Sequence, residues 1–117
     1  MRKFYLPVAV VVFIAVACSG PDRGEYRDMA AEDVCHEAER CGNLGPDGLH
    51  ETHSDCIIEE RKRFNDMWPE QQCGDGRIDA DAYDRCIDRA LDVACEDHWA
   101  DWLVAAERCD ANEVCVN

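Results

Sequence analysis

Apolar residues recur at helical spacing along most of the chain beyond residue 30. The clearest series follows Asp79, where apolar side chains stand at i, i+3, i+4, i+7, i+8, i+11 and i+12, the pattern of an amphipathic helix with one buried stripe. The stripe consists of Tyr83, Cys86, Ile87, Ala90, Leu91, Ala94 and Cys95. Asp79 or Asp81 would cap this helix. Strand-like alternation never exceeds four residues after residue 17, so the predicted fold class is all-α.

Two more helices are predicted before this one. The first begins at Ala30, ends at Gly42 as a left-handed cap, and turns inward Ala31, Val34, Cys35, Ala38 and Cys41. Turn-forming residues at 43–48 predict a loop. The second helix begins near Thr52 or Ser54, ends before Pro69, and turns inward Cys56, Ile57, Phe64, Met67 and Trp68. The charged run 59–63 is expected to be a solvated face of this helix.

The remaining segments are less regular. Residues 69–79 hold Cys73 and two glycines and are predicted to lack regular structure. A further helix begins at 96–97 and turns inward Trp99, Trp102, Leu103, Ala106 and Cys109. No Gly or Pro separates it from the preceding helix, so one bent helix through residue 109 and two helices both stay open. The chain end is expected to be held only by a disulfide of Cys115. The prediction is a small disulfide-stapled bundle of three to four helices.

The first residues form a leader of a different kind. Arg2 and Lys3 precede 14 residues, 4–17, that are almost entirely apolar. This stretch is shorter than the roughly 20 residues of a bilayer-spanning helix, and Pro7 interrupts it, which favours a cleaved signal peptide. Residues 15–18 read Ala-Val-Ala-Cys and resemble the lipobox of bacterial lipoproteins, which prefers Leu where this chain has Ala15. An ordinary secretory peptide cut near Ala17 is the alternative.

Lipidation of Cys18 would make the cysteine count even. Of nine cysteines, the other eight would then form disulfides: Cys35, Cys41, Cys56, Cys73, Cys86, Cys95, Cys109 and Cys115. The predicted organisation is a lipoprotein signal peptide at 1–17, a lipidated N-terminus and flexible tether at 18–29, and a Cys-rich helical domain at 30–117. By resemblance to the sorting rules of diderm bacteria, Ser19 indicates the outer membrane, facing the periplasm or the surface, and the inner membrane stays open.

Helix geometry restricts the pairing of these cysteines. Cys86 and Cys95 lie about 13 Å apart along their helix and on opposite borders of the stripe, so they cannot pair with each other. Each must link the helix to a different neighbour, which predicts that this helix is the centre of the bundle. Cys35 and Cys41 cannot pair with each other either, because about 9 Å and 240° separate them. The favoured pairing joins the residues that flank the first turn, Cys41 and Cys56. Weaker guesses by the same logic are Cys73–Cys86, Cys95–Cys109 and Cys35–Cys115.

Composition and charge exclude some partners. Removing residues 1–17 takes away two of the 12 basic residues and none of the 26 acidic ones, which leaves a net charge of about −16. Such a chain is not expected to bind nucleic acid or anionic lipid headgroups. The acidic residues are spread over all segments, which is typical of a solvated surface; binding of cations or basic partners is the alternative. A hydrophobic core in one domain of this size gives only marginal stability. Disulfides, each adding about 3 kcal/mol to the free energy of unfolding, would supply the stability that the core lacks.

Few residues suggest chemistry. His50 and His53 stand three apart near Asp55 and are weak candidates for a metal site, because no third ligand is indicated. Gly76 and Ile78 resemble the middle of an EF-hand loop, but Gln71, Cys73 and Ala82 then stand where calcium ligands belong, so a helix-capping turn pinned by Cys73 is expected instead.

Catalysis finds no candidate residues. The chain has no nucleophile elbow, phosphate-binding loop or zinc-protease motif, and the cysteines are all assigned to lipid or disulfides. We therefore expect a protein that is not an enzyme and has no cofactor. The tryptophans Trp68, Trp99 and Trp102 are expected in an aromatic core rather than in a ligand groove.

Taken together, several features resemble a family of small Cys-rich lipoproteins of myxobacterial type, some of them labelled natural product biosynthesis lipoproteins. They are the lipobox, the start at Cys35, Cys41 and Gly42, the Gly45-Pro46 loop, Cys73 with Gly76, Ile78 and Asp79, the Cys86 to Cys95 helix, and the closing pair Cys109 and Cys115. The resemblance implies a surface lipoprotein linked to secondary metabolism and assigns no residue a role beyond the disulfides.

The sequence thus predicts a lipid-anchored, extracytoplasmic domain with a binding or structural role. It attaches to the membrane through its N-terminal lipid, and the sequence names no protein or small-molecule partner. The alternative is a small metal-binding or cationic-ligand-binding protein of the cell envelope, for which the histidines and carboxylates are the only support.

Overall fold

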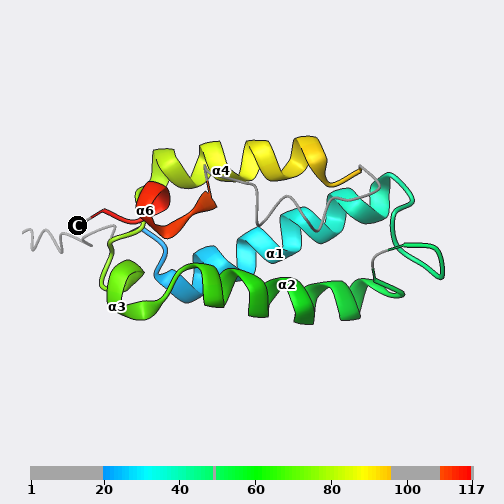
Figure 1. The fold of residues 1–117 in the computed structure, drawn as a ribbon, viewed down its shortest axis with the longest axis horizontal. Coiled ribbons are helices and arrows are strands. Elements are labelled where there is room, and N and C mark those ends of the chain that lie inside the picture. The colour runs from blue at the N-terminus through cyan, green and yellow to red at the C-terminus, as the bar shows by residue number, and fades with distance from the viewer. Residues whose placement is uncertain (1–19, 49, 96–108, 117) are drawn as a thin grey trace, which may run out of the picture.

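The described part of the chain is built from helices, as predicted. The computed structural model describes residues 20–48, 50–95 and 109–116. Its elements are α1 (Arg23–Arg40), α2 (His53–Met67), α3 (Glu70–Cys73), α4 (Ala80–Val93) and α6 (Ala111–Val114). The three long helices form the bundle, with α1 between α2 and α4 (Figure 1). The helix predicted after residue 95, and the question of one bent helix or two, lie outside the described residues.

Helix α1 begins seven residues earlier than the sequence pattern predicts. The Oδ1 atom of Asp22 caps it by accepting a 2.8 Å hydrogen bond from the backbone N–H of Glu25. Tyr26, in the second turn, is only 6% exposed. Residues 23–29, expected within a flexible tether that ends at residue 29, are therefore helical, and this part of the prediction is wrong. Tyr26 and Ala30 are the only core residues among 23–30, so the apolar spacing was too sparse to indicate a helix.

The turn between α1 and α2 follows its predicted chemistry. Gly42 adopts a positive φ of 76° just after the end of α1, as expected of a left-handed cap. Gly48 lies so close to the loop backbone that a Cβ atom there would stand 2.2 Å from the carbonyl oxygen of Asn43. Thr52 then caps α2, its Oγ1 accepting from the N–H of Asp55 at 3.1 Å. The predicted second helix is confirmed.

Residues 69–79 contain more structure than predicted. Pro69 starts the single turn α3, so the expectation of no regular structure is wrong at 70–73. The chain then reverses through Asp75 and Gly76, which both have positive φ. Asp79 caps α4, with its Oδ1 accepting from the N–H of Ala82 at 2.8 Å. The expected capping turn, pinned by a disulfide of Cys73, is confirmed.

Aromatic side chains from three elements fill the centre of one half of the bundle. The ring centroids of Tyr26 and Tyr83 lie 4.6 Å apart, those of Phe64 and Trp68 5.0 Å, and those of Trp68 and Tyr83 5.9 Å. Trp68 is fully buried, and its indole N–H donates to the carbonyl oxygen of Cys109 at 2.9 Å. The core position expected for Trp68 is confirmed. Trp99 and Trp102 lie outside the described residues.

The eight cysteines beyond Cys18 form four disulfides, as predicted, but every predicted pairing is wrong. The pairs are Cys35–Cys56, Cys41–Cys95, Cys73–Cys115 and Cys86–Cys109. Buried Cys35 faces α2, whereas Cys41, beyond the end of α1, reaches the end of α4; this is why Cys41 does not pair with Cys56. As predicted, Cys86 and Cys95 link their helix to different neighbours.

The central helix of the bundle is α1 and not α4. Helix α1 packs against both α2 and α4, so the expectation that the Cys86 to Cys95 helix is central is wrong. The positions of Cys86 and Cys95 require only that α4 have two neighbours, not that it be central. The second neighbour is the C-terminal segment, residues 109–116, to which Cys86 is bonded through Cys109.

The C-terminal segment is held by more than its disulfide, contrary to prediction. The backbone N–H of Asp79 donates to the carbonyl oxygen of Val114 at 2.8 Å, and the backbone N–H of Val116 donates to the carbonyl oxygen of Arg77 at 2.7 Å. Val114 is fully buried. Backbone pairing, the packing of α6 and the Cys73–Cys115 bond thus join this segment to the turn before α4.

Candidate functional site

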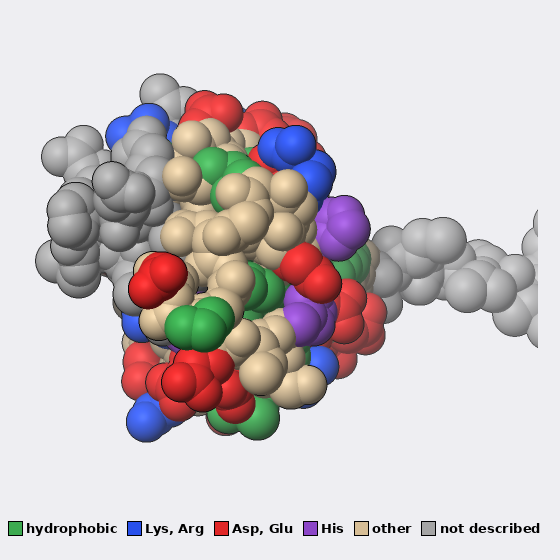
Figure 2. Space-filling view, turned by 90° about the vertical axis from the view of Figure 1, so that its right-hand side faces the viewer, with side chains coloured by type: hydrophobic (Ala, Val, Ile, Leu, Met, Phe, Trp, Pro, Cys, Tyr) green, Lys and Arg blue, Asp and Glu red, His purple; other side chains and the backbone are tan. Residues whose placement is uncertain are grey.

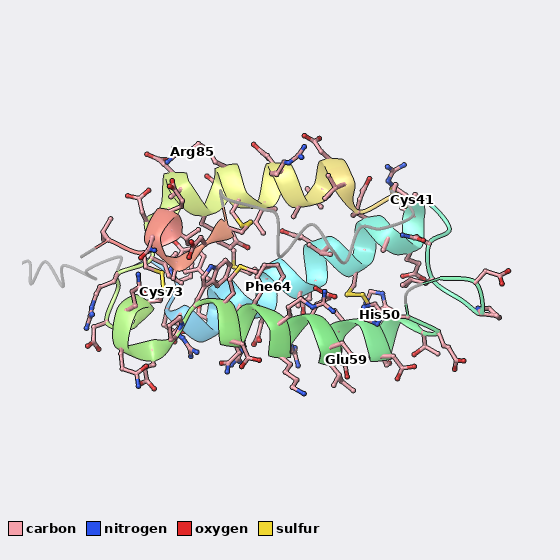
Figure 3. All side chains as sticks on the ribbon, in the orientation of Figure 1. Cys41, His50, Glu59, Phe64, Cys73 and Arg85 are labelled. Atoms are coloured by element: carbon pink, nitrogen blue, oxygen red, sulfur yellow. A yellow bond between two sulfur atoms is a disulfide. The ribbon has the colours of Figure 1, made fainter. Side chains whose placement is uncertain are left out.

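The two histidines proposed for a metal site point to different partners. His50 is buried at the end of the bundle that carries the α1–α2 loop (Figure 3). Its Nε2 lies 3.2 Å from Oε1 of Glu60. His53, the first residue of α2, is half-exposed, and its Nδ1 lies 2.9 Å from Oε2 of Glu39 on α1. Within residues 20–48, 50–95 and 109–116, no three His, Cys, Asp or Glu side chains converge as a metal site would require.

Glu60 is the unexpected member of this region, because the sequence placed it on a solvated face. Its side chain is fully buried, and its Oε2 has no hydrogen-bond partner in the described structure. Burial raises the pKa of the Glu60 carboxyl, while Arg63, whose Nε lies 3.9 Å from Oε1, and His50 oppose that rise. A signal was present: Glu60 stands four residues after Cys56 and four before Phe64, so it belongs to the buried stripe of α2.

The His50–Glu60 pair holds the loop between α1 and α2 against α2. His50 forms an isolated bridge with Leu44, and its carbonyl oxygen accepts from the N–H of Gly45 at 2.9 Å. The imidazole then reaches across to the third turn of α2. The pair therefore fixes the path of the loop, which is a structural task that needs neither metal nor substrate.

A surface groove lies beside this region, between α1 and α2. It encloses about 400 Å³ and is lined by Glu32, Asp33, His36, His53 and Ile57. Figure 2 shows the end of the molecule that carries the α1–α2 loop, with histidine side chains next to acidic ones. Burial and the charge of Glu32 raise the pKa of Asp33, and His36 opposes this. The carboxylates and imidazoles, together with the aliphatic side chain of Ile57, could hold an organic cation.

Two further depressions on the described helices have lining residues of mixed charge. One runs along α4 and is lined by Arg85, Asp88, Arg89 and Asp92; another lies on α2 and is lined by Glu59, Lys62, Arg63 and Asp66. Both have two basic and two acidic residues, as expected of a solvated helix face. Neither depression has a lining of uniform charge that would favour a ligand of one charge sign.

All eight cysteines of the described residues form disulfides, and Cys18 lies outside the described residues. None of the helices described for residues 20–116 is both long and apolar enough to cross a bilayer.

A search for similar proteins found one family, which has no known function, and its profile matches residues 35–117. No curated protein and no solved structure matches the chain. The matched region includes all eight disulfide cysteines and most of the bundle, and the chain belongs to this family of unknown function, DUF6184.

Proposed function

We propose that this protein is a lipid-anchored lipoprotein of the cell envelope whose disulfide-stapled helical domain has a binding or structural role. The observation that carries the proposal is the use of the cysteines. Eight form four disulfides within the domain, and this leaves Cys18, which follows a basic and apolar leader, as the ninth. Acylation of that cysteine explains why the number is odd.

The disulfides support an extracytoplasmic location. Disulfides persist in oxidising compartments and are rare in the cytosol. Three of the four pairs are buried within the core, where they replace part of the apolar packing that a small domain lacks. A leader that directs export agrees with this chemistry.

A lipid at Cys18 would keep the domain close to the bilayer. Helix α1 begins at Arg23, five residues after Cys18. Five residues span at most about 18 Å at roughly 3.5 Å per residue. The helical bundle would therefore stand near the headgroups rather than on a long stalk. Ser19 favours the outer membrane, and the cysteine spacing, which resembles that of natural product biosynthesis lipoproteins, favours a role beside secondary metabolism.

Metabolic labelling with an alkyne fatty acid tests the anchor. The wild-type chain should take up the label, and Cys18→Ser should abolish it. The matched control is Cys41→Ser combined with Cys95→Ser, which removes two cysteines from the domain and should leave labelling unchanged. A wild-type chain without label, or labelling that survives Cys18→Ser, would contradict the proposal.

The groove between α1 and α2 supports a second candidate function, the binding of a small organic cation. Glu32 and Asp33 offer two carboxylates beside His36 and His53. The probe is 1,4-diaminobutane, titrated against the protein while amide shifts are followed by NMR. Shifts should be centred on the groove and weaken in Glu32→Gln with Asp33→Asn, but not in the surface control Asp66→Asn. Shifts spread over all acidic residues would exclude a specific site.

A further inference from the structure

The four disulfides differ sharply in their access to solvent. Six of the cysteines are buried, none more than 4% exposed: Cys35, Cys56, Cys73, Cys86, Cys109 and Cys115. Cys41 and Cys95, which pair with each other, are both exposed. Exchange requires a thiolate to reach a disulfide sulfur, so access separates this pair from the other three.

The exposed disulfide also occupies a distinct mechanical position. Cys41 is the C-terminal cap of α1, and Cys95 follows the end of α4 by two residues. Their bond therefore ties two helix ends together. Cys41 lies beside the loop at one end of the bundle (Figure 3). At this end the side chain of Asn43 also donates to the carbonyl oxygen of Ala94 at 3.1 Å.

The opposite end of α4 is fixed independently. There the ring of Tyr83 packs at a tilt against that of Tyr26, and the buried Cys86–Cys109 and Cys73–Cys115 bonds hold the C-terminal segment against the start of α4. The buried Cys35–Cys56 bond joins α1 to α2. Opening of the Cys41–Cys95 bond would thus leave the three buried disulfides closed and release only the C-terminal end of α4.

We propose that Cys41–Cys95 is a thiol-exchange site of this protein, reduced by a dithiol while the other three disulfides remain closed. One thiolate of the dithiol attacks a sulfur of the pair, the S–S bond breaks, and the departing sulfur takes up a proton. The second thiol of the dithiol, as its thiolate, then attacks the mixed disulfide and releases the second cysteine, which is protonated in turn. The dithiol is oxidised to a disulfide, and the chain gains two electrons and two protons.

Reduction would uncover apolar surface. Ala90, Val93 and Ala94 near the end of α4 are at most 4% exposed in the closed bundle. After the bond opens, this packing and the hydrogen bond from Asn43 to Ala94 still hold the end of α4. When these contacts open, the reduced protein would expose the apolar residues at the C-terminal end of α4, which are buried in the oxidised protein.

A carboxylate beside Cys95 would slow this exchange. Oε1 of Glu37, which is paired with Arg40, lies 3.8 Å from Sγ of Cys95, the sulfur that an incoming thiolate would approach. Removing one charge at this distance changes an interaction of about 1 kcal/mol in water, which corresponds to roughly a fivefold change in rate. Glu37→Gln should therefore accelerate reduction about fivefold, and Asp66→Asn, an exposed charge change on α2, should not.

The experiment treats the full-length protein in detergent with increasing dithiothreitol, without denaturant. Free thiols are alkylated at intervals and located by peptide mass spectrometry. Cys41 and Cys95 should be labelled first and together, with the other six cysteines unlabelled, and Glu37→Gln should shorten the half-time. Simultaneous labelling of any buried pair, or no labelling before the whole chain unfolds, would overturn the proposal. An unchanged half-time in Glu37→Gln would overturn the assigned role of that carboxylate.

Discussion

The imidazole of His50 and the carboxylate of Glu60 form a buried pair, with 3.2 Å between Nε2 and Oε1. The pair joins a loop to the middle of α2 across a part of the chain where sequence alone indicated only exposed charge. A buried carboxylate with one oxygen lacking a hydrogen bond is costly to ionise. This cost gives the fold a dependence on pH.

The free energy of unfolding should decrease as the pH rises above the ordinary pKa of a glutamate carboxyl, because Glu60 is buried. Burial raises the pKa of Glu60 above 4.5, so the folded state binds this proton more tightly than the unfolded state does. The corresponding stabilisation is fully present below pH 4.5 and is lost as the pH rises through the folded pKa. Urea unfolding with the disulfides intact, followed from pH 4 upward, measures this loss.

Glu60→Gln should remove this component of the pH dependence, because the amide cannot ionise. The control is Glu113→Gln on α6, an exposed carboxyl at a distance from the pair, which should keep the wild-type profile. A Glu60→Gln protein with the same pH profile as wild type would contradict the assignment.

The helical bundle should require the residues just before the family match. The side chain of Arg23 donates to the carbonyl oxygen of Trp68 and, through Nη2, to Oδ1 of Asn65 at 2.9 Å, and the ring of Tyr26 packs at a tilt against that of Tyr83. A chain that begins at Ala30 loses these contacts and should be destabilised by roughly 3 kcal/mol or more relative to one that begins at Asp22. Thermal and urea unfolding compare the two. Equal stability would mean that residues 22–29 act as a tether after all.

Trp68→Phe should test the hydrogen bond at the centre of the core. The substitution removes the indole N–H and leaves the carbonyl oxygen of Cys109 without that donor. We expect a loss of about 1–3 kcal/mol in the free energy of unfolding. Phe64→Leu, a smaller apolar side chain in the same cluster, removes packing alone and should cost less. An equal or smaller cost for Trp68→Phe would argue against the bond.

Tryptic digestion without reduction should distinguish the observed disulfides from the pairing favoured by sequence. Cleavage after Arg40 and Arg61 places Cys41 and Cys56 on one peptide, 41–61. The observed bonds link that peptide to two others, which carry Cys35 and Cys95. A peptide 41–61 free of partners, closed by its own disulfide, would contradict the structure.

The sequence was informative where structure is local. The caps Thr52 and Asp79 and the turn at Gly42 were predictable because each is decided by a few neighbouring residues. The stripe of α4 was predictable because its apolar residues keep a strict helical period.

Features that depend on tertiary packing were not predictable from one sequence. The start of α1 rests on Tyr26 meeting Tyr83, 57 residues away, and the disulfide pairing depends on which helix lies between the others. Glu60 was hidden inside a run of charges, although its position on the Cys56–Phe64 stripe was visible. The groove between α1 and α2 combines residues from two helices, so no local pattern could indicate it.

The most direct test of a lipid anchor combined with a disulfide-closed domain is the intact mass of the protein purified from bacterial membranes. The mass is measured before and after reduction and alkylation. We predict a mature chain that begins at Cys18 and carries acyl groups, with eight alkylations that appear only after reduction. Unacylated protein, or thiols that react before reduction, would contradict the account.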